Sequence, residues 1–211
     1  MNMETYMIIL AGGSGTRFGG PVKKQFLEFH GKPLWRYMYD TATEVLPKEN
    51  IVVVGIDIAG GSTRSGSVKN GLAWCAEKGD CQRVVICEAA RALVTKAQLQ
   101  EIVNHDSPSC CFVNPVVDTV ILTDKTYLTR SECRHLVSPQ AFDFKLLWNA
   151  YKDCDLGEMR TDETRLMNDV YGIKPDFLEG GENLYKVTYP KDIAIIEVIY
   201  KSQHAKDEEN S

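Results

Sequence analysis

Residues 7–20 read MIILAGGSGTRFGG, and this stretch decides the fold. Its first four residues form an apolar run that glycines end, which is typical of a buried strand. Five glycines then fall within Ala11–Gly20, and glycine lets backbone N–H groups approach an anion closely. Arg17 lies in this loop, and Lys23 and Lys24 follow it. The stretch therefore predicts a strand that leads into a phosphate-binding loop.

Apolar runs alternate with helical patterns along the rest of the chain. Uniformly apolar strands separated by helices indicate a parallel sheet that is covered on both faces. We expect an α/β, Rossmann-like, mostly parallel sheet. The expected strands are 7–10, 51–56, 84–87, 111–117, 119–122 and 185–187. The expected helices are 34–46, one from 68 onwards, 96–103, 142–151, 162–171 and 190–201.

The domain organisation follows from the same pattern. No linker divides the chain, so we expect a single domain over 1–201. Residues of about 112–137 do not fit the strand–helix alternation, and we interpret them as a short projecting β-arm. The polar residues 202–211 are expected to form a disordered tail.

Composition excludes several classes of partner. The chain has 24 Lys+Arg against 29 Asp+Glu, a net charge of −5, which argues against nucleic-acid binding through a broad basic face. No apolar run approaches the roughly 20 residues that span a bilayer, and no secretory signal is visible. The seven cysteines are odd in number and contain no C-x-x-C pair. We therefore expect no disulfide framework, no membrane partner and a cytoplasmic location.

The first loop does not match two common glycine motifs. The P-loop string G-x-x-x-x-G-K-[ST] does not occur, and Phe18 occupies the third glycine position of the dinucleotide fingerprint. A redox protein is therefore the least favoured interpretation, and a nucleotide-binding loop of another kind is indicated.

Six segments in order resemble one enzyme group. They are L-A-G-G-x-G-x-R-F-G from residue 10, then 60–72, 87–95, 138–142, 161–163 and 183–192. Together they are similar to the CTP-dependent cytidylyltransferases for 2-C-methyl-erythritol 4-phosphate and ribitol 5-phosphate. The resemblance implies a nucleotidyltransferase domain of glycosyltransferase-A-like fold. It also implies transfer of CMP from CTP to a small polyol phosphate, with release of pyrophosphate.

The resemblance also implies roles for individual residues. Arg17, Lys24 and Lys186 would act on the triphosphate, and Glu88 would bind Mg²⁺. Thr119, Arg130 and Thr161 would bind the acceptor, the first two on an arm from a second subunit, which implies a homodimer. The residues implied to bind the nucleotide are Leu10, Ala11, Gly12, Gly13, Gly15, Gly61, Ser62, Ser67 and Ala89.

Structural explanations compete with some of these roles. Ser65 or Ser67 could cap the following helix, and Thr161 could cap the helix that begins near Asp162. Arg130 could belong to a solvated hairpin. Arg64 is expected to stabilise its loop rather than to touch the ligand.

Several departures from the family pattern leave the acceptor open. Cys87, Glu88 and Ala92 stand where the family has histidine, aspartate and proline. The arm and the segment before Gly60 are short, and the opening L-A-G-G and the string at 117–120 lean towards the ribitol branch. A phosphonate acceptor such as 2-aminoethylphosphonate is one alternative. A sugar-1-phosphate nucleotidyltransferase and an inactive nucleotide-binding regulatory protein are two more.

Overall fold

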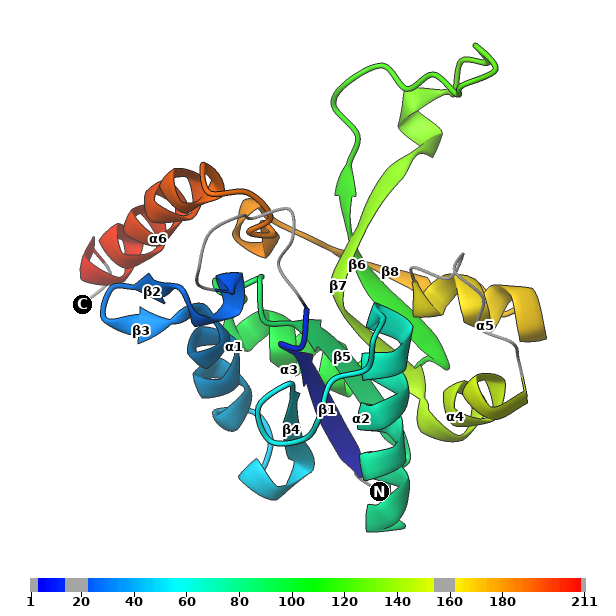
Figure 1. The fold of residues 1–211 in the computed structure, drawn as a ribbon. Coiled ribbons are helices and arrows are strands. Elements are labelled where there is room, and N and C mark those ends of the chain that lie inside the picture. The colour runs from blue at the N-terminus through cyan, green and yellow to red at the C-terminus, as the bar shows by residue number, and fades with distance from the viewer. Residues whose placement is uncertain (1–3, 14–22, 154–161, 210–211) are drawn as a thin grey trace.

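The computed structural model describes residues 4–13, 23–153 and 162–209. Its main sheet has six strands in the order β4-β1-β5-β7-β6-β8 (Figure 1). Strand β7 is antiparallel to both of its neighbours, whereas the other pairings are parallel. The strands are β1 Thr5–Leu10, β4 Ile51–Val54, β5 Arg83–Glu88, β6 Ser109–Pro115, β7 Arg134–Asp143 and β8 Asp176–Glu179. The mostly parallel sheet predicted from the sequence is thus confirmed.

Helices cover both faces of this sheet. They are α1 Leu34–Thr43, α2 Arg64–Lys78, α3 Lys96–Asn104, α4 Phe144–Asp153, α5 Glu163–Tyr171 and α6 Asp192–Glu209. A small hairpin pairs β2 Glu28–Phe29 with β3 Lys32–Pro33. Short 3₁₀ helices lie at Lys24–Phe26, Lys48–Asn50, Arg130–Glu132 and Glu182–Leu184.

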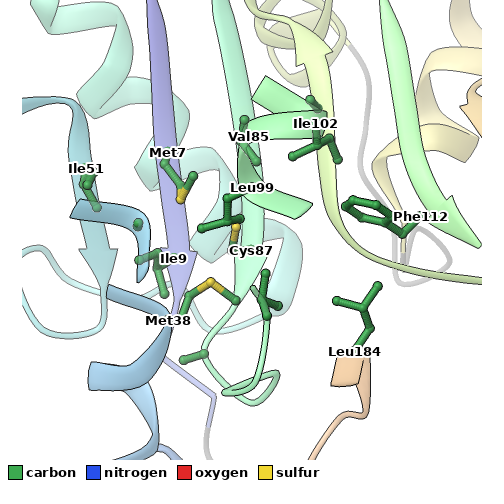
Figure 2. Close-up of a cluster of buried hydrophobic side chains, with 14 of the residues drawn as sticks. Met7, Ile9, Met38, Ile51, Val85, Cys87, Leu99, Ile102, Phe112 and Leu184 are labelled. Atoms are coloured by element: carbon green, nitrogen blue, oxygen red, sulfur yellow. The ribbon is translucent and has the colours of Figure 1, made fainter. Parts of the chain in front are cut away.

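Alternate residues of the central strands face two separate cores. Met7 and Ile9 of β1 point to the side of α1 and α3, where they pack with Met38 and Leu99 (Figure 2). Ile8 of β1 points to the opposite side and packs with residues of α2, α4 and α5. This alternation is the period of two that a strand imposes, and it explains why strands covered on both faces contain few polar residues.

Sequence patterning predicts the central elements well and the edges poorly. Strand β7 was not predicted, because Pro139 and polar residues interrupt its apolar run. The expected strand at 185–187 is wrong. Val187 donates one backbone hydrogen bond to Ala90, and a single bond does not make a ladder. The last strand of the chain is instead β8, which pairs with β6 at the edge of the sheet.

Residues between β6 and β7 project from the body as an arm (Figure 1). Here the expected strand at 119–122 is wrong, since the segment contributes just one isolated bridge, between Ile121 and Tyr127. Large apolar side chains are exposed on the arm, with Val117 at 75% and Tyr127 at 72%. The arm is thus a surface that the described residues of this chain do not cover.

The C-terminal helix is longer than expected. We predicted a helix to about residue 201 and a disordered tail beyond it, but α6 continues to Glu209. Residues 202–209 can extend the helix because they contain no glycine or proline to end it. Among the described residues, no helix is both long and apolar enough to cross a bilayer. The six cysteines in the described ranges are all free.

Candidate functional site

A cleft of about 510 Å³ opens where β1 and β5 end. Strand β1 delivers Leu10 and the start of the glycine loop to its wall, and β5 delivers Glu88. The carboxyl ends of parallel strands are where ligands bind in open α/β sheets. The lining residues are Leu10, Ala11, Gly12, Gly13, Lys23, Lys24, Gln25, Gly61, Ser62, Thr63, Arg64, Ser67, Glu88, Ala89, Ala90 and Lys186.

Two glycine-containing loops meet at this cleft. A Cβ on Gly12 would lie 3.3 Å from the Cα of Gly60, so the loops touch backbone to backbone. The Gln25 side-chain amide donates to the Gly13 carbonyl at 3.1 Å and fixes the first loop. The backbone N–H of Gly61 donates to Ser67 Oγ at 3.1 Å and fixes the second.

Helix α2 begins directly at the second loop. Its N-cap is Thr63, whose side chain accepts a hydrogen bond from the Gly66 backbone, so neither Ser65 nor Ser67 is the cap. Ser67 lies one turn into the helix, is 4% exposed, and faces the loop. The N-terminal end of a helix attracts anions, so α2 adds a favourable field at this edge of the cleft.

Positive side chains enter the cleft from distant parts of the chain. Lys24 lies in the 3₁₀ helix after the first loop, and its ammonium donates to the Val187 carbonyl at 3.0 Å. That contact places Lys24 next to the segment carrying Lys186. Arg64, the first residue of α2, also lines the cleft. The sequence spacing of these residues is large, and the fold brings them to one wall.

Glu88 lies at the centre of these cations. Lys186 Nζ donates to Glu88 Oε1 at 2.7 Å, and Arg64 Nε lies 3.6 Å from the same oxygen. On the other side, Arg91 Nε is 3.6 Å from Glu88 Oε2. Arg91, which follows β5, also donates to Ser138 Oγ and to the Leu184 carbonyl. These bonds tie the segment after β5 to β7 and to the 3₁₀ helix Glu182–Leu184.

This surrounding charge keeps Glu88 ionised. Burial alone would raise the pKa of Glu88, but Lys186, and then Arg91 and Arg64, lower it to about 2. The neighbouring Cys87 is fully buried, and burial raises the pKa of its thiol. Cys87 is therefore a core residue behind the site. Glu88 is the group of the site that stays negatively charged at neutral pH.

The Glu88 ion cluster predicts a specific pH dependence of stability. A carboxyl group with a lowered pKa in the folded state stabilises it above the unfolded-state pKa, and this contribution disappears as pH falls through the folded-state value. Glu88→Gln should therefore lower the free energy of unfolding at pH 7 by up to about 3 kcal/mol. The difference from the parent protein should shrink between the ordinary value of 4.5 and about 2.

Urea unfolding at pH 7 and at steps down to pH 2.5 measures this difference. Glu101→Gln, at an exposed carboxylate on α3, is the control and should follow the parent protein throughout. A Glu88→Gln deficit that stays constant down to pH 2.5 would contradict the assigned ionisation.

The structure brings together most of the residues singled out from the sequence. Lys24, Lys186, Glu88 and the described members of the nucleotide-binding set all line the cleft. Arg17, Gly15 and Thr161 lie outside the described residues. Thr119 and Arg130 are exposed on the arm and do not line the cleft; Arg130 donates to the Val117 carbonyl and borders a separate hollow with Arg134.

Other lining residues were not assigned to the site from the sequence. Gln25 is 3% exposed. Its position directly after Lys24, a predicted site residue, is the sequence feature that could have indicated it. Arg64 was expected to stabilise its loop, and it does line the cleft as well. Thr63, Ala90 and the exposed Lys23 complete the wall.

A mostly parallel sheet with glycine loops and lysines around a cleft of about 510 Å³ is the arrangement expected of a nucleotidyltransferase. Comparison with known sequences gives the particular family. The profile of IspD, 2-C-methyl-D-erythritol 4-phosphate cytidylyltransferase, matches residues 5–202, and the chain belongs to this family.

Individual relatives agree with this membership. A bifunctional enzyme IspD/IspF of Campylobacter jejuni subsp. doylei is 33% identical over 204 residues, which cover 90% of this chain and 53% of that protein. The 2-C-methyl-D-erythritol 4-phosphate cytidylyltransferase of Alkaliphilus oremlandii is 27% identical over 229 residues, 95% of this chain and 96% of that one. The chain spans about half the length of the bifunctional relatives that it matches.

A solved structure supports the fold independently. The 4-diphosphocytidyl-2C-methyl-D-erythritol synthase of Anaerococcus prevotii superposes with a TM-score of 0.78 at 21% identity, over 95% of this chain and all of that one. At this identity the likeness establishes the shared fold.

Proposed function

We propose that this chain transfers CMP from CTP to the phosphate of 2-C-methyl-D-erythritol 4-phosphate. The observation that carries the proposal is the convergence of Lys24, Lys186 and two glycine loops on one cleft. A cytidylyltransferase must hold a nucleoside triphosphate, and this cleft offers lysine side chains and glycine-loop N–H groups suited to one. The family description and the name of the Alkaliphilus oremlandii relative both give this acceptor, which favours it over ribitol 5-phosphate.

The proposed chemistry is displacement at the α-phosphorus of CTP. An acceptor phosphate oxygen forms a new bond to that phosphorus, and the bond to the bridging oxygen of the β-phosphate breaks. The electron pair leaves with pyrophosphate, and the product is a CDP-alcohol. Because the attacking phosphate is already anionic at neutral pH, a general base is unnecessary. The requirement is cations and N–H donors placed where negative charge gathers.

Mg²⁺ is proposed to bind in the cleft together with the nucleotide. Glu88 is the one carboxylate among the described lining residues, and no group of three candidate ligands occurs in the described parts of the chain. Magnesium is commonly held by one or two carboxylates together with substrate phosphates, so a single ionised Glu88 fits that role. When bound there, the ion would neutralise phosphate charge. Lys186 would then exchange Glu88 for a phosphate oxygen.

A substrate panel tests the proposed activity. The full chain is incubated with CTP, UTP, GTP or ATP, with Mg²⁺, and with one acceptor at a time, and pyrophosphate is measured. The acceptors are methylerythritol phosphate, ribitol phosphate, glycerol phosphate and aminoethylphosphonate. We expect CTP with methylerythritol phosphate to give the highest kcat/KM. Higher activity with UTP than with CTP would support a sugar-1-phosphate nucleotidyltransferase instead. Folded protein that releases no pyrophosphate with any acceptor would support an inactive nucleotide-binding protein.

The arm is proposed to serve the cleft of a second copy of the chain. Its exposed apolar residues have no cover within the described chain, and Arg130 does not reach the cleft of its own chain. An arginine can bind a phosphate through two parallel hydrogen bonds. A homodimer would thus place Arg130 of one copy at the acceptor of the other.

Substitution of Arg130 tests this arrangement. Arg130→Ala should raise KM for the acceptor on the order of tenfold to a hundredfold, because a charge-assisted hydrogen bond is lost, and should leave the affinity for CTP unchanged. Arg36→Ala, at an exposed arginine on α1, is the control. Mixing inactive Lys186→Ala protein with Arg130→Ala protein should restore activity if the arm acts across the interface. Weakened CTP binding in Arg130→Ala would contradict the assigned place of the arm.

A further inference from the structure

A second carboxylate, Glu163, lies behind the cleft wall and is almost completely buried. It is the first residue of α5, is 1% exposed, and does not line the cleft. Arg64 donates to both of its oxygens, from Nη1 at 2.7 Å and from Nη2 at 2.9 Å. The Tyr151 hydroxyl of α4 donates to Oε1 at 2.9 Å. Glu163 therefore holds Arg64 through a two-pronged contact supported by a third donor.

These contacts fix the charge of the pair. Burial would lower the pKa of Arg64, but the Glu163 carboxylate more than offsets this and holds that pKa above its ordinary range. Burial, and then the same carboxylate, raise the pKa of Tyr151, so its hydroxyl stays a donor. A buried carboxylate with such partners is a rigid anchor, because moving any member leaves a buried charge uncompensated.

The anchored arginine connects Glu163 to the nucleotide cleft in two ways. Arg64 is the residue immediately after the loop containing Gly61 and Ser62, so its position sets the position of that loop. Its Nε also lies 3.6 Å from Glu88 Oε1, the oxygen that Lys186 contacts at 2.7 Å. The charges thus alternate along a row from Glu163 through Arg64 and Glu88 to Lys186.

We infer that Glu163 is a positioning residue for the nucleotide cleft, which it serves through Arg64. Its carboxylate holds the guanidinium away from Glu88 and holds the start of α2 against α5. Without this anion, Arg64 still faces the Glu88 carboxylate, whose Oε1 lies 3.6 Å from its Nε. The guanidinium would move towards Glu88 Oε1, compete with Lys186, and shift the nucleotide loop. This inference rests on the proposed binding of CTP.

The test compares CTP binding with acceptor binding. Glu163→Gln keeps the shape of the side chain and removes its charge. The dissociation constant for CTP, measured by calorimetry, should rise on the order of tenfold, while KM for the acceptor changes by less than about twofold. Asp169→Asn is the matched control, since Asp169 lies on the same helix in an exposed ion pair with Arg165. It should bind CTP like the parent protein.

A double-substitution cycle separates positioning from general stability. If Glu163 acts through Arg64, then Glu163→Gln combined with Arg64→Gln should bind CTP no more weakly than Arg64→Gln alone. Where Glu163→Gln fails to fold, Glu163→Asp takes its place. Aspartate keeps the charge but lengthens the contact with Arg64, so it should weaken CTP binding by a smaller factor and leave KM for the acceptor unchanged.

Two outcomes are decisive. A folded Glu163 variant with a lower melting temperature but parental CTP affinity would overturn the inference and leave Glu163 as a structural ion-pair partner. Parent protein that binds no CTP would instead overturn the proposed function, which distinguishes the two failures.

Discussion

Lys186→Ala is expected to lower kcat by on the order of a hundredfold or more, which is the usual loss when one group that stabilises transition-state charge is removed. The Lys186 ammonium lies in the cleft, 2.7 Å from Glu88, on a side chain that is 31% exposed. It is therefore free to exchange its carboxylate partner for a phosphate oxygen as negative charge builds up during displacement. Alanine removes this cation and leaves nothing in its place.

The fold should tolerate this change. After removal of Lys186, Glu88 still has Arg64 and Arg91 at 3.6 Å, so its charge keeps two cations. Lys186 lowers the pKa of Glu88 more than either arginine does, so the melting temperature should fall, but the protein should still fold. Steady-state pyrophosphate release, measured well below that melting temperature, and a thermal unfolding scan separate the loss of kcat from the loss of stability. Lys191→Ala, at an exposed lysine five residues further along, is the control. Turnover close to that of the parent protein would remove Lys186 from the catalytic set.

The central elements were predictable because local sequence and tertiary structure agree there. Strand β1 is apolar on both faces, and both faces are covered, so the run at 7–10 could be interpreted directly. Helix α5 ends at Gly172 in the left-handed conformation, as the glycine predicts. Its N-cap is Asp162, whose side chain accepts from the Thr164 backbone, and not Thr161 as one alternative held.

Other elements depend on partners that the sequence does not reveal locally. Strand β7 buries Ser138 and Gln140. Arg91 donates to the Ser138 hydroxyl, and the Gln140 amide nitrogen donates to Asp162 at 2.7 Å, whereas the Gln140 side-chain oxygen has no partner among the described residues. Buried polar groups normally need a hydrogen-bond partner, and the partners of Ser138 and Gln140 are far away in the sequence. Their presence therefore prevented prediction of a buried strand here. The pairing of Glu163 with Arg64 spans 99 positions and had no local signal at all.

The site also combines features that the sequence predicts with features that only the structure explains. Resemblance identified Gly61 as a nucleotide-binding residue from the motif at 60–72, without a physical reason for glycine there. The structure supplies that reason. A Cβ on Gly61 would lie 2.4 Å from the carbonyl carbon of Gly66 and 2.7 Å from the backbone nitrogen of Ser67. These atoms belong to the first turn of α2 and cannot give way as the end of a side chain would.

Gly61→Ala is accordingly expected to weaken CTP binding by on the order of a hundredfold, because backbone displaced by as little as 1 Å can cost about that much. The loop must move off α2, which breaks the bond from the Gly61 N–H to Ser67 Oγ and alters the cleft wall. Gly13→Ala is the matched comparison in the same cleft, since its Cβ would meet nothing within 4 Å. It should weaken binding far less. Calorimetric titration with CTP measures both, and equal losses in the two variants would show that steric contact with α2 is not what requires glycine at position 61.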